Sequence, residues 1–162
     1  MPLVKAGAII ADPYVFVAEG DLPEGAVLIP LARLQAEADT LDRRNAPIGV
    51  KVPNTTDVTA LAPLLSRISL IALEFPKFRD GRAFSQARLL RERLGFSGEL
   101  RATGNVLRDQ LLLMARCGFD AFEVEKAEDA AHVAEAMSSY TIFYQPTGDG
   151  RGTVARARAA GA

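Results

Sequence analysis

Apolar and polar positions along the chain follow two patterns that alternate in a regular order. Runs of apolar residues, typical of strands covered on both faces, occupy residues 48–53, 69–75, 98–104, 120–125 and 141–145. Segments with apolar residues three and four positions apart, typical of helices, follow the first four runs at 57–68, 81–94, 106–117 and 127–138. This alternation predicts an α/β fold of repeated, right-handed βα units with a mainly parallel sheet.

The residues before this repeat follow a less regular pattern. Two short apolar runs flank Asp12 and Pro13 and predict a small N-terminal hairpin. A short strand is expected at 26–30, after the turn-forming sequence "LPEG", and a helix is expected at 31–44. Pro63, inside the expected helix at 57–68, weakens the middle of that helix.

We interpret residues 1–145 as a single domain and residues 146–162, which are poor in bulky apolar side chains, as a flexible tail. Two architectures fit the repeat: a partial (β/α) barrel, and a flavodoxin-like open sheet with helices on both faces. A complete eight-fold barrel needs roughly 200 residues or more, whereas the chain has 162. In both architectures, ligands bind at the carboxyl ends of the strands.

Composition narrows the classes of function. The formal net charge is −1, so no overall field attracts nucleic acid or an anionic membrane. A single histidine and a single cysteine, Cys117, exclude a multi-histidine metal site, an internal disulfide and an iron–sulfur cluster. No segment is long and apolar enough to span a bilayer or to form a secretory core, so we expect a cytoplasmic protein without a metal site.

Four expected strands carry one charged residue each, with alternating sign: Lys51, Glu74, Arg101 and Glu123. Neighbouring strands would bring these side chains into one row near the carboxyl edge of the sheet. One interpretation is a structural row of ion pairs, since isolated buried charges are costly. The other is a ligand site, in which Lys51 and Arg101 hold an anion while a carboxylate, Glu74 or Glu123, transfers protons.

Two loops at the same edge add candidate ligand-binding residues. The loop before the helix at 81–94 is basic, and its charged residues, Lys77, Arg79, Asp80 and Arg82, suit an anionic ligand or an acidic partner. By contrast, residues 118–140 carry six carboxylates against Lys126.

The second loop, "TGNV", contains Gly104 and Asn105. Asn105 is expected to cap the next helix and to help form an anion site. Gln110 lies within the apolar stripe of that helix and needs a buried partner or a ligand.

The central sequence "LEFPKFRDGRAFSQARLLRERLGFSGELRATGNVLRDQLLLMARCGFDAFEV" resembles bacterial domain-of-unknown-function family 934. The upstream "LPEGAVLIPLARL" and the closing "YTIFYQ" are also similar to that family, so the resemblance covers roughly residues 20–145. Its members are commonly labelled as oxidoreductases involved in sulfite reduction. Family members carry aspartate where this chain has Asn105, which removes a carboxylate but keeps a side chain suited to capping a helix.

The resemblance implies an accessory protein of assimilatory sulfite reduction, with sulfite reductase or another sulfur-assimilation protein as its partner. The chain has too few cysteines for sirohaem chemistry with an iron–sulfur cluster, and it lacks the glycine fingerprint of a dinucleotide-binding protein. Three alternatives therefore stay open. They are a subunit whose basic loop 77–82 contacts a reductase, an enzyme or binding protein for a small anionic metabolite, and a structural protein that forms a homo-oligomer.

Overall fold

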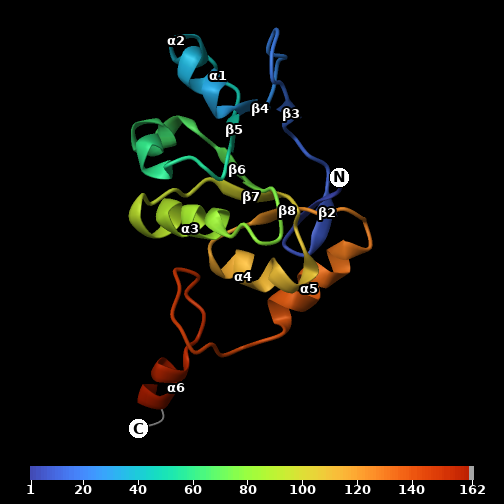
Figure 1. The fold of residues 1–162 in the computed structure, drawn as a ribbon, viewed down its shortest axis with the longest axis vertical. Coiled ribbons are helices and arrows are strands. Elements are labelled where there is room, and N and C mark those ends of the chain that lie inside the picture. Colours follow the sequence, from blue (N-terminus) through green and yellow to red (C-terminus); the bar gives the residue numbers. More distant parts are fainter. Residues whose placement is uncertain (161–162) are drawn as a thin grey trace.

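One curled sheet organises the molecule, which we describe from a computed structural model over residues 1–160. The eight strands lie in the order β2-β1-β8-β7-β6-β5-β4-β3 (Figure 1). In chain order their bounds are Leu3–Lys5, Ala8–Ile10, Val15–Phe16, Val27–Pro30, Ile48–Val52, Leu70–Phe75, Glu99–Gly104 and Ala121–Glu123. Strands β3 to β8 are parallel to one another, and β1 is antiparallel to both β2 and β8.

The consecutive order of the parallel strands decides between the two predicted architectures. A flavodoxin-like sheet has a strand order that reverses part-way, which places helices on both faces. Here each crossover leads to the adjacent strand, so right-handed connections place the helices on one face. The sheet curls into a half-barrel, which confirms the predicted mainly parallel α/β fold.

The helical elements, except α6, pack along the outer face of this half-barrel (Figure 1). The α-helices are α1 (Leu31–Ala36), α2 (Ala38–Leu41), α3 (Arg82–Arg88), α4 (Leu111–Arg116), α5 (Asp129–Ser138) and α6 (Val154–Ala160). Two 3₁₀ segments, η1 (Val58–Arg67) and η3 (Arg108–Gln110), and one π turn, η2 (Leu89–Arg93), complete the set. Alternate strand residues facing these helices form the main hydrophobic core, as Val50, Ile71, Leu73, Leu100 and Phe122 illustrate.

Several element boundaries differ from the predictions. The expected helix at 57–68 is a 3₁₀ segment, because Pro63 cannot donate a backbone hydrogen bond in an α-helix. The expected helix at 31–44 is divided between α1 and α2. The expected helix at 106–117 starts only with η3 at Arg108, so the prediction that Asn105 caps it is wrong.

The two ends of the chain also depart from the predicted elements. The N-terminal hairpin is present, but it turns at Ala6 and Gly7, which both have positive φ, and not at Asp12 and Pro13. The predicted strand at 141–145 is wrong, because only a single bridge joins Phe143 to Thr153 there. The residues interpreted as a tail contain α6, which extends beyond the body of the molecule in Figure 1.

A short N-terminal segment, residues 11–14, covers part of the inner face of the half-barrel, and we call it the strap. The Tyr14 ring packs on Leu28, Leu70 and Ala72, and its hydroxyl donates a hydrogen bond to Ser69 Oγ at 3.1 Å. Helices cover only the outer face, so the strap supplies the apolar cover that this part of the inner face needs.

The strap is fixed to the sheet by Arg101, whose side chain is fully buried. The guanidinium donates to both carboxylate oxygens of Asp12, at 2.6 and 3.0 Å, and to Glu99 Oε1 at 3.1 Å. Glu123 Oε1 lies 3.6 Å from the same group. Burial alone would lower the pKa of Arg101, but the hydrogen bonds to Asp12 and the neighbouring carboxylates raise that pKa above its ordinary value.

Substitution of Arg101 tests whether this network stabilises the fold. Arg101→Met leaves three carboxylates facing one another without their cation, and we expect the free energy of unfolding to fall by about 3 kcal/mol. Urea denaturation at neutral pH measures the change. Lys5→Met is the matched control, because Lys5 contacts Glu99 from a half-exposed position, and it should cost less than about 1 kcal/mol. Equal effects of the two variants would contradict this role for Arg101.

Candidate functional site

The carboxyl ends of β5, β6 and β7 lie side by side at one edge of the half-barrel. Phe75 pairs with Gly104 across β6 and β7, and the Asn105 amide donates to the Phe75 carbonyl at 2.7 Å. Gly104 has a φ of +85°, and a Cβ there would lie 2.6 Å from the Phe75 oxygen, so only glycine fits this close approach. The loops that follow β6 and β7 therefore open onto a shared rim.

Lys51 and Glu74 face the inner side of this rim. In β5 the residues Ile48, Val50 and Val52 turn toward the helices, which leaves Lys51 on the inner face. Its Nζ lies 3.6 Å from Glu74 Oε1 on the neighbouring strand, and each side chain is 38% exposed. The ion pair is long and open to water, so both charged groups are accessible to a ligand.

The pair borders a hollow of about 320 Å³ between the end of β4 and the loop after β5. Its walls are mainly apolar and include Pro30, Leu31 and Pro53. Gln35 and Thr56 add an amide and a hydroxyl to the lining. The hollow thus combines one cation, one carboxylate and two neutral hydrogen-bonding groups with an apolar wall, which is the usual composition of a small-molecule site.

The predicted row of four charges forms two separate pairs. Lys51 contacts Glu74, whereas Arg101 contacts Glu123 and uses its guanidinium on Asp12 and Glu99. Arg101 is therefore a structural cation in this arrangement, and Glu123 lies beside it, away from the residues that line the hollow.

The charged residues of the basic loop after β6 also fall into two groups, one that forms an ion pair and one that is exposed without such a contact among the described residues. Arg82 donates two hydrogen bonds to Asp80, at 2.9 and 2.7 Å, and this contact holds the pKa of the Asp80 carboxyl well below its usual range. Lys77 and Arg79 are exposed, and neither forms an ion pair within residues 1–160. Phe78 lies between them and is 55% exposed.

Gln86 is a supporting residue that sequence reasoning missed. Its side chain is buried, and its Nε2 donates to the backbone oxygens of Pro53 at 3.1 Å and Thr56 at 2.9 Å. These contacts fix the loop that lines the hollow. The signal that could have found it is a polar residue on the apolar side of a helix, because Gln86 lies on the same side as Ala83 and Leu90. The same signal identified Gln110 in the helix expected at 106–117. Gln110 itself is half-buried and lies outside the hollow.

A comparison with protein-family models finds a match for this chain. The model described as "Bacterial protein of unknown function (DUF934)" matches residues 49–155, about two thirds of the chain. The chain belongs to this family. No curated protein matches the chain. Within residues 1–160, none of the helices has both the length and the hydrophobicity that crossing a membrane requires.

The family's matched region contains Lys51 and Glu74 but excludes Asp12 and the strap. It also contains the loop with Lys77 and Arg79 and reaches into α6. The charged residues of the candidate site therefore belong to the part of the chain that the family model matches, whereas Pro30, Leu31 and Gln35 of its wall lie outside that part. The Asp12 carboxylate that neutralises Arg101 also lies outside it.

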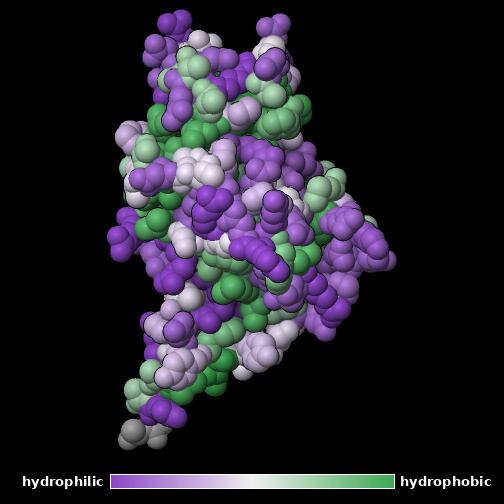
Figure 2. All heavy atoms as spheres, in the orientation of Figure 1, coloured by the Kyte–Doolittle hydropathy of each residue, from purple (hydrophilic) through white to green (hydrophobic). Residues whose placement is uncertain are grey.

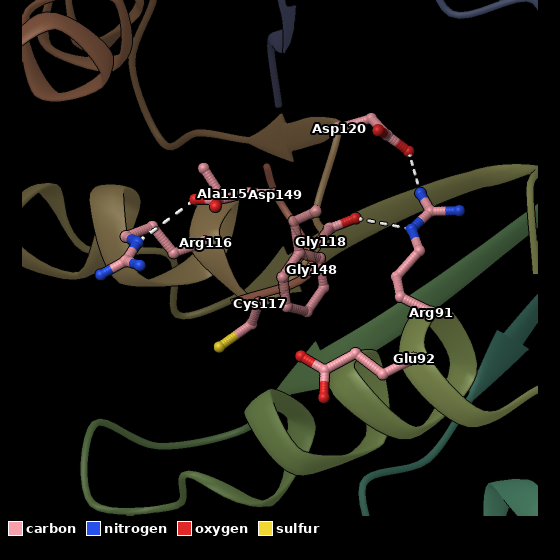
Figure 3. A pocket seen from close by; sticks show the side chains of 10 residues that line it. Arg91, Glu92, Ala115, Arg116, Cys117, Gly118, Asp120, Gly148 and Asp149 are labelled. Carbon is pink, nitrogen blue, oxygen red and sulfur yellow. Dashed lines mark hydrogen bonds and ion pairs between the residues drawn. The ribbon is translucent and has the colours of Figure 1, made fainter. Parts of the chain in front are cut away.

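A second hollow, of about 260 Å³, lies at the opposite edge of the half-barrel, where β8 begins (Figure 3). Arg91 donates to the backbone oxygens of Phe96, Gly98 and Gly118 and pairs with Asp120. Arg116, in turn, contacts the segment 145–149 at the other side of this hollow. Arg91 and Arg116 thus hold backbone segments together. This arrangement indicates that the hollow lies in a region that stabilises the fold, as is typical of the amino edge of a parallel barrel.

Cys117 is among the residues that line this second hollow (Figure 3), and it is also part of the main hydrophobic core. The residue is buried, and burial raises the pKa of the thiol. Because the thiolate is the reactive form, the folded protein keeps this cysteine in its unreactive state at neutral pH.

Alkylation of Cys117 should therefore be slow in the folded protein. At pH 8, we expect iodoacetamide to modify it at least roughly tenfold more slowly than a free cysteine, whose thiol has a pKa of about 8.5. Mass spectrometry of timed samples measures the rate, and the same reaction in concentrated urea provides the unfolded control. A folded-state rate equal to the urea rate would show that the thiol is accessible and ionised.

Proposed function

We propose that this protein binds a small anionic metabolite in the hollow beside Lys51 and Glu74. The observation that carries the proposal is the open ion pair, in which Nζ and Oε1 are 3.6 Å apart and both side chains are 38% exposed. A ligand anion can replace Glu74 as the partner of the Lys51 ammonium without uncovering a buried charge. The position at the carboxyl edge of parallel strands supports the same assignment.

The lining restricts the chemistry of the ligand. The hollow of about 320 Å³ is near the lower end of small-molecule sites, which favours a ligand of metabolite size. Leu31 and the two prolines of the wall favour an apolar portion next to the anionic group. Glu74 disfavours a second anion. It favours a ligand that also carries an amine or a hydroxyl, because either group can donate a hydrogen bond to the carboxylate.

The family resemblance suggests the process in which the ligand is used. We propose that the protein acts as an accessory component of assimilatory sulfite reduction in the bacterial cytoplasm, associated with an oxidoreductase. The exposed sequence Lys77-Phe78-Arg79 supports a docking role, because an aromatic residue between two cations is typical of the centre of an interface. Its charge suits an acidic surface on sulfite reductase or another sulfur-assimilation protein.

Thermal shift measurements with a panel of metabolites test the ligand site. A compound that binds only the native state raises the melting temperature, by several degrees at a hundredfold excess over its dissociation constant. We expect shifts for sulfur-containing or phosphorylated anions, loss of these shifts in Lys51→Met, and their retention in the control Lys126→Met, which lies far along the chain in an exposed loop. Glu74→Gln should weaken only ligands that carry an amine or a hydroxyl. Unchanged shifts in Lys51→Met would refute this site.

Capture experiments test the docking role. From lysates of bacteria grown on sulfate as the sulfur source, the wild-type protein should retain a sulfite reductase component at about 50 mM salt and release it at about 500 mM salt, where charges are strongly screened. The double variant Lys77→Glu/Arg79→Glu should retain none. Arg93→Glu, which reverses an exposed cation elsewhere, is the matched control and should behave like the wild type. Absence of any reductase component at low salt would contradict the docking role.

A further inference from the structure

The C-terminal arm, residues 140–160, has an ordered base and an uncovered end. At the base, Phe143 is buried, and the Arg116 guanidinium lies 3.9 Å from the centre of its ring. Arg151 donates to the Met137 carbonyl, and Arg116 pairs with Asp149, so the arm is attached firmly to α4 and α5. Beyond this base, none of the residues of α6 is buried.

An uncovered helix of this length is not stable by itself. Isolated helices shorter than about 12–15 residues are marginal in water, and α6 spans Val154–Ala160. Other side chains of the arm add unburied apolar area: Tyr140, Ile142 and Tyr144 are 61%, 52% and 84% exposed. Figure 2 shows hydrophobic side chains exposed among polar ones along the narrow lower part of the molecule. Both features indicate a surface that a partner covers.

The charge of the arm restricts the partner. Residues 150–160 contain Arg151, Arg156 and Arg158 and no acidic residue. The same chain carries an excess of the opposite charge, because residues 118–140 contain six carboxylates against Lys126, and Glu128, Asp129 and Glu135 of these lie at the start of α5 or within it. A partner with the matching charge is therefore already available in a second copy of this chain.

A groove on this acidic side has the properties that α6 needs. It measures about 430 Å³ and lies between the start of α4 and α5. Leu112, Ala136 and Tyr140 line it together with the carboxylates of Asp109 and Glu135, and the lining also includes Arg108, His132 and Ser139, so the carboxylates outnumber the one arginine. Asp109 is exposed and forms no ion pair within the described part of the chain, and Glu135 contacts Arg108 in a pair that is exposed on both sides. The two arginines of α6 oppose the net negative charge of this groove, and the alanines of α6 suit its apolar lining.

We propose that two copies of this protein form a symmetric dimer in which α6 of each copy binds the groove between α4 and α5 of the other. The contact is reciprocal, as a two-fold interface requires. Arg156 and Arg158 face the carboxylates of Asp109 and Glu135, and the exposed Tyr140, Ile142 and Tyr144 pack near the two-fold axis. The arm keeps its attachment at Phe143, so no refolding of the base is needed.

Light scattering after size-exclusion chromatography tests the dimer. At about 50 mM salt and tens of micromolar protein, the wild type should have twice the 17.4 kDa mass of the chain. Arg156→Glu/Arg158→Glu and Asp109→Arg/Glu135→Arg should each be monomeric, because each places like charges together. Circular dichroism and the melting temperature show whether these variants keep the fold.

Mixing the two double variants gives the decisive measurement. In the mixed pair, the acidic α6 of the first variant meets the basic groove of the second, and the basic α6 of the second meets the acidic groove of the first. We expect the dimer mass to return only in the mixture. A monomeric wild type, a dimer that persists in either variant alone, or a mixture that stays monomeric would each overturn the proposal. None of these results bears on ligand binding at Lys51.

Discussion

The buried guanidinium of Arg101 is the constraint on which the inner face of this half-barrel depends. All connections between the parallel strands lie on the outer face, so the inner face has no helices to cover it. A closed barrel solves this problem with the opposite strands, which are missing here. The strap takes their place, and it is held by the contact of Asp12 with Arg101 across 89 positions of the chain. A cation removed from water in this way requires its carboxylates, so the strap and the sheet depend on each other.

The same curvature accounts for the candidate site. The strap covers the inner face at β6 and β7 through Tyr14 and Asp12 but leaves the ends of β4 and β5 open. Arg101 and Lys51 look alike in the sequence, because each is the single cation of an apolar strand. In the fold, the Arg101 side chain is fully buried, whereas the Lys51 side chain is 38% exposed. What separates a structural cation from an available one is the presence of the strap above it.

The sequence predicted the features that local patterns determine. The apolar runs located β5, β6 and β7, and their parallel order placed the loops after Phe75 and Thr103 at one rim. Features that depend on distant residues were not predicted in the same way. Asp12 and Pro13 have the composition of a turn, but Asp12 is held by Arg101, so the hairpin forms earlier. The aromatic run at 141–145 has the composition of a strand, but Phe143 packs against arginines instead of pairing within the sheet. Lys51 and Glu74 were identified because each is a charge in an apolar strand, whereas the hollow beside them depends on where α1 packs.

The position of the arm relative to the hollow has a further consequence. In Figure 1, α1 and β4, which border the hollow, lie at one end of the longest axis, and α6 lies at the other. A dimer formed through α6 would therefore leave the hollow beside Lys51 and the basic loop after β6 accessible in each copy. The docking of α6 depends on charges at 109, 135, 156 and 158, none of which contributes to the hollow. The half-barrel thus separates its surfaces: the amino edge stabilises the fold, the carboxyl edge is available for a ligand, and the arm is available for assembly.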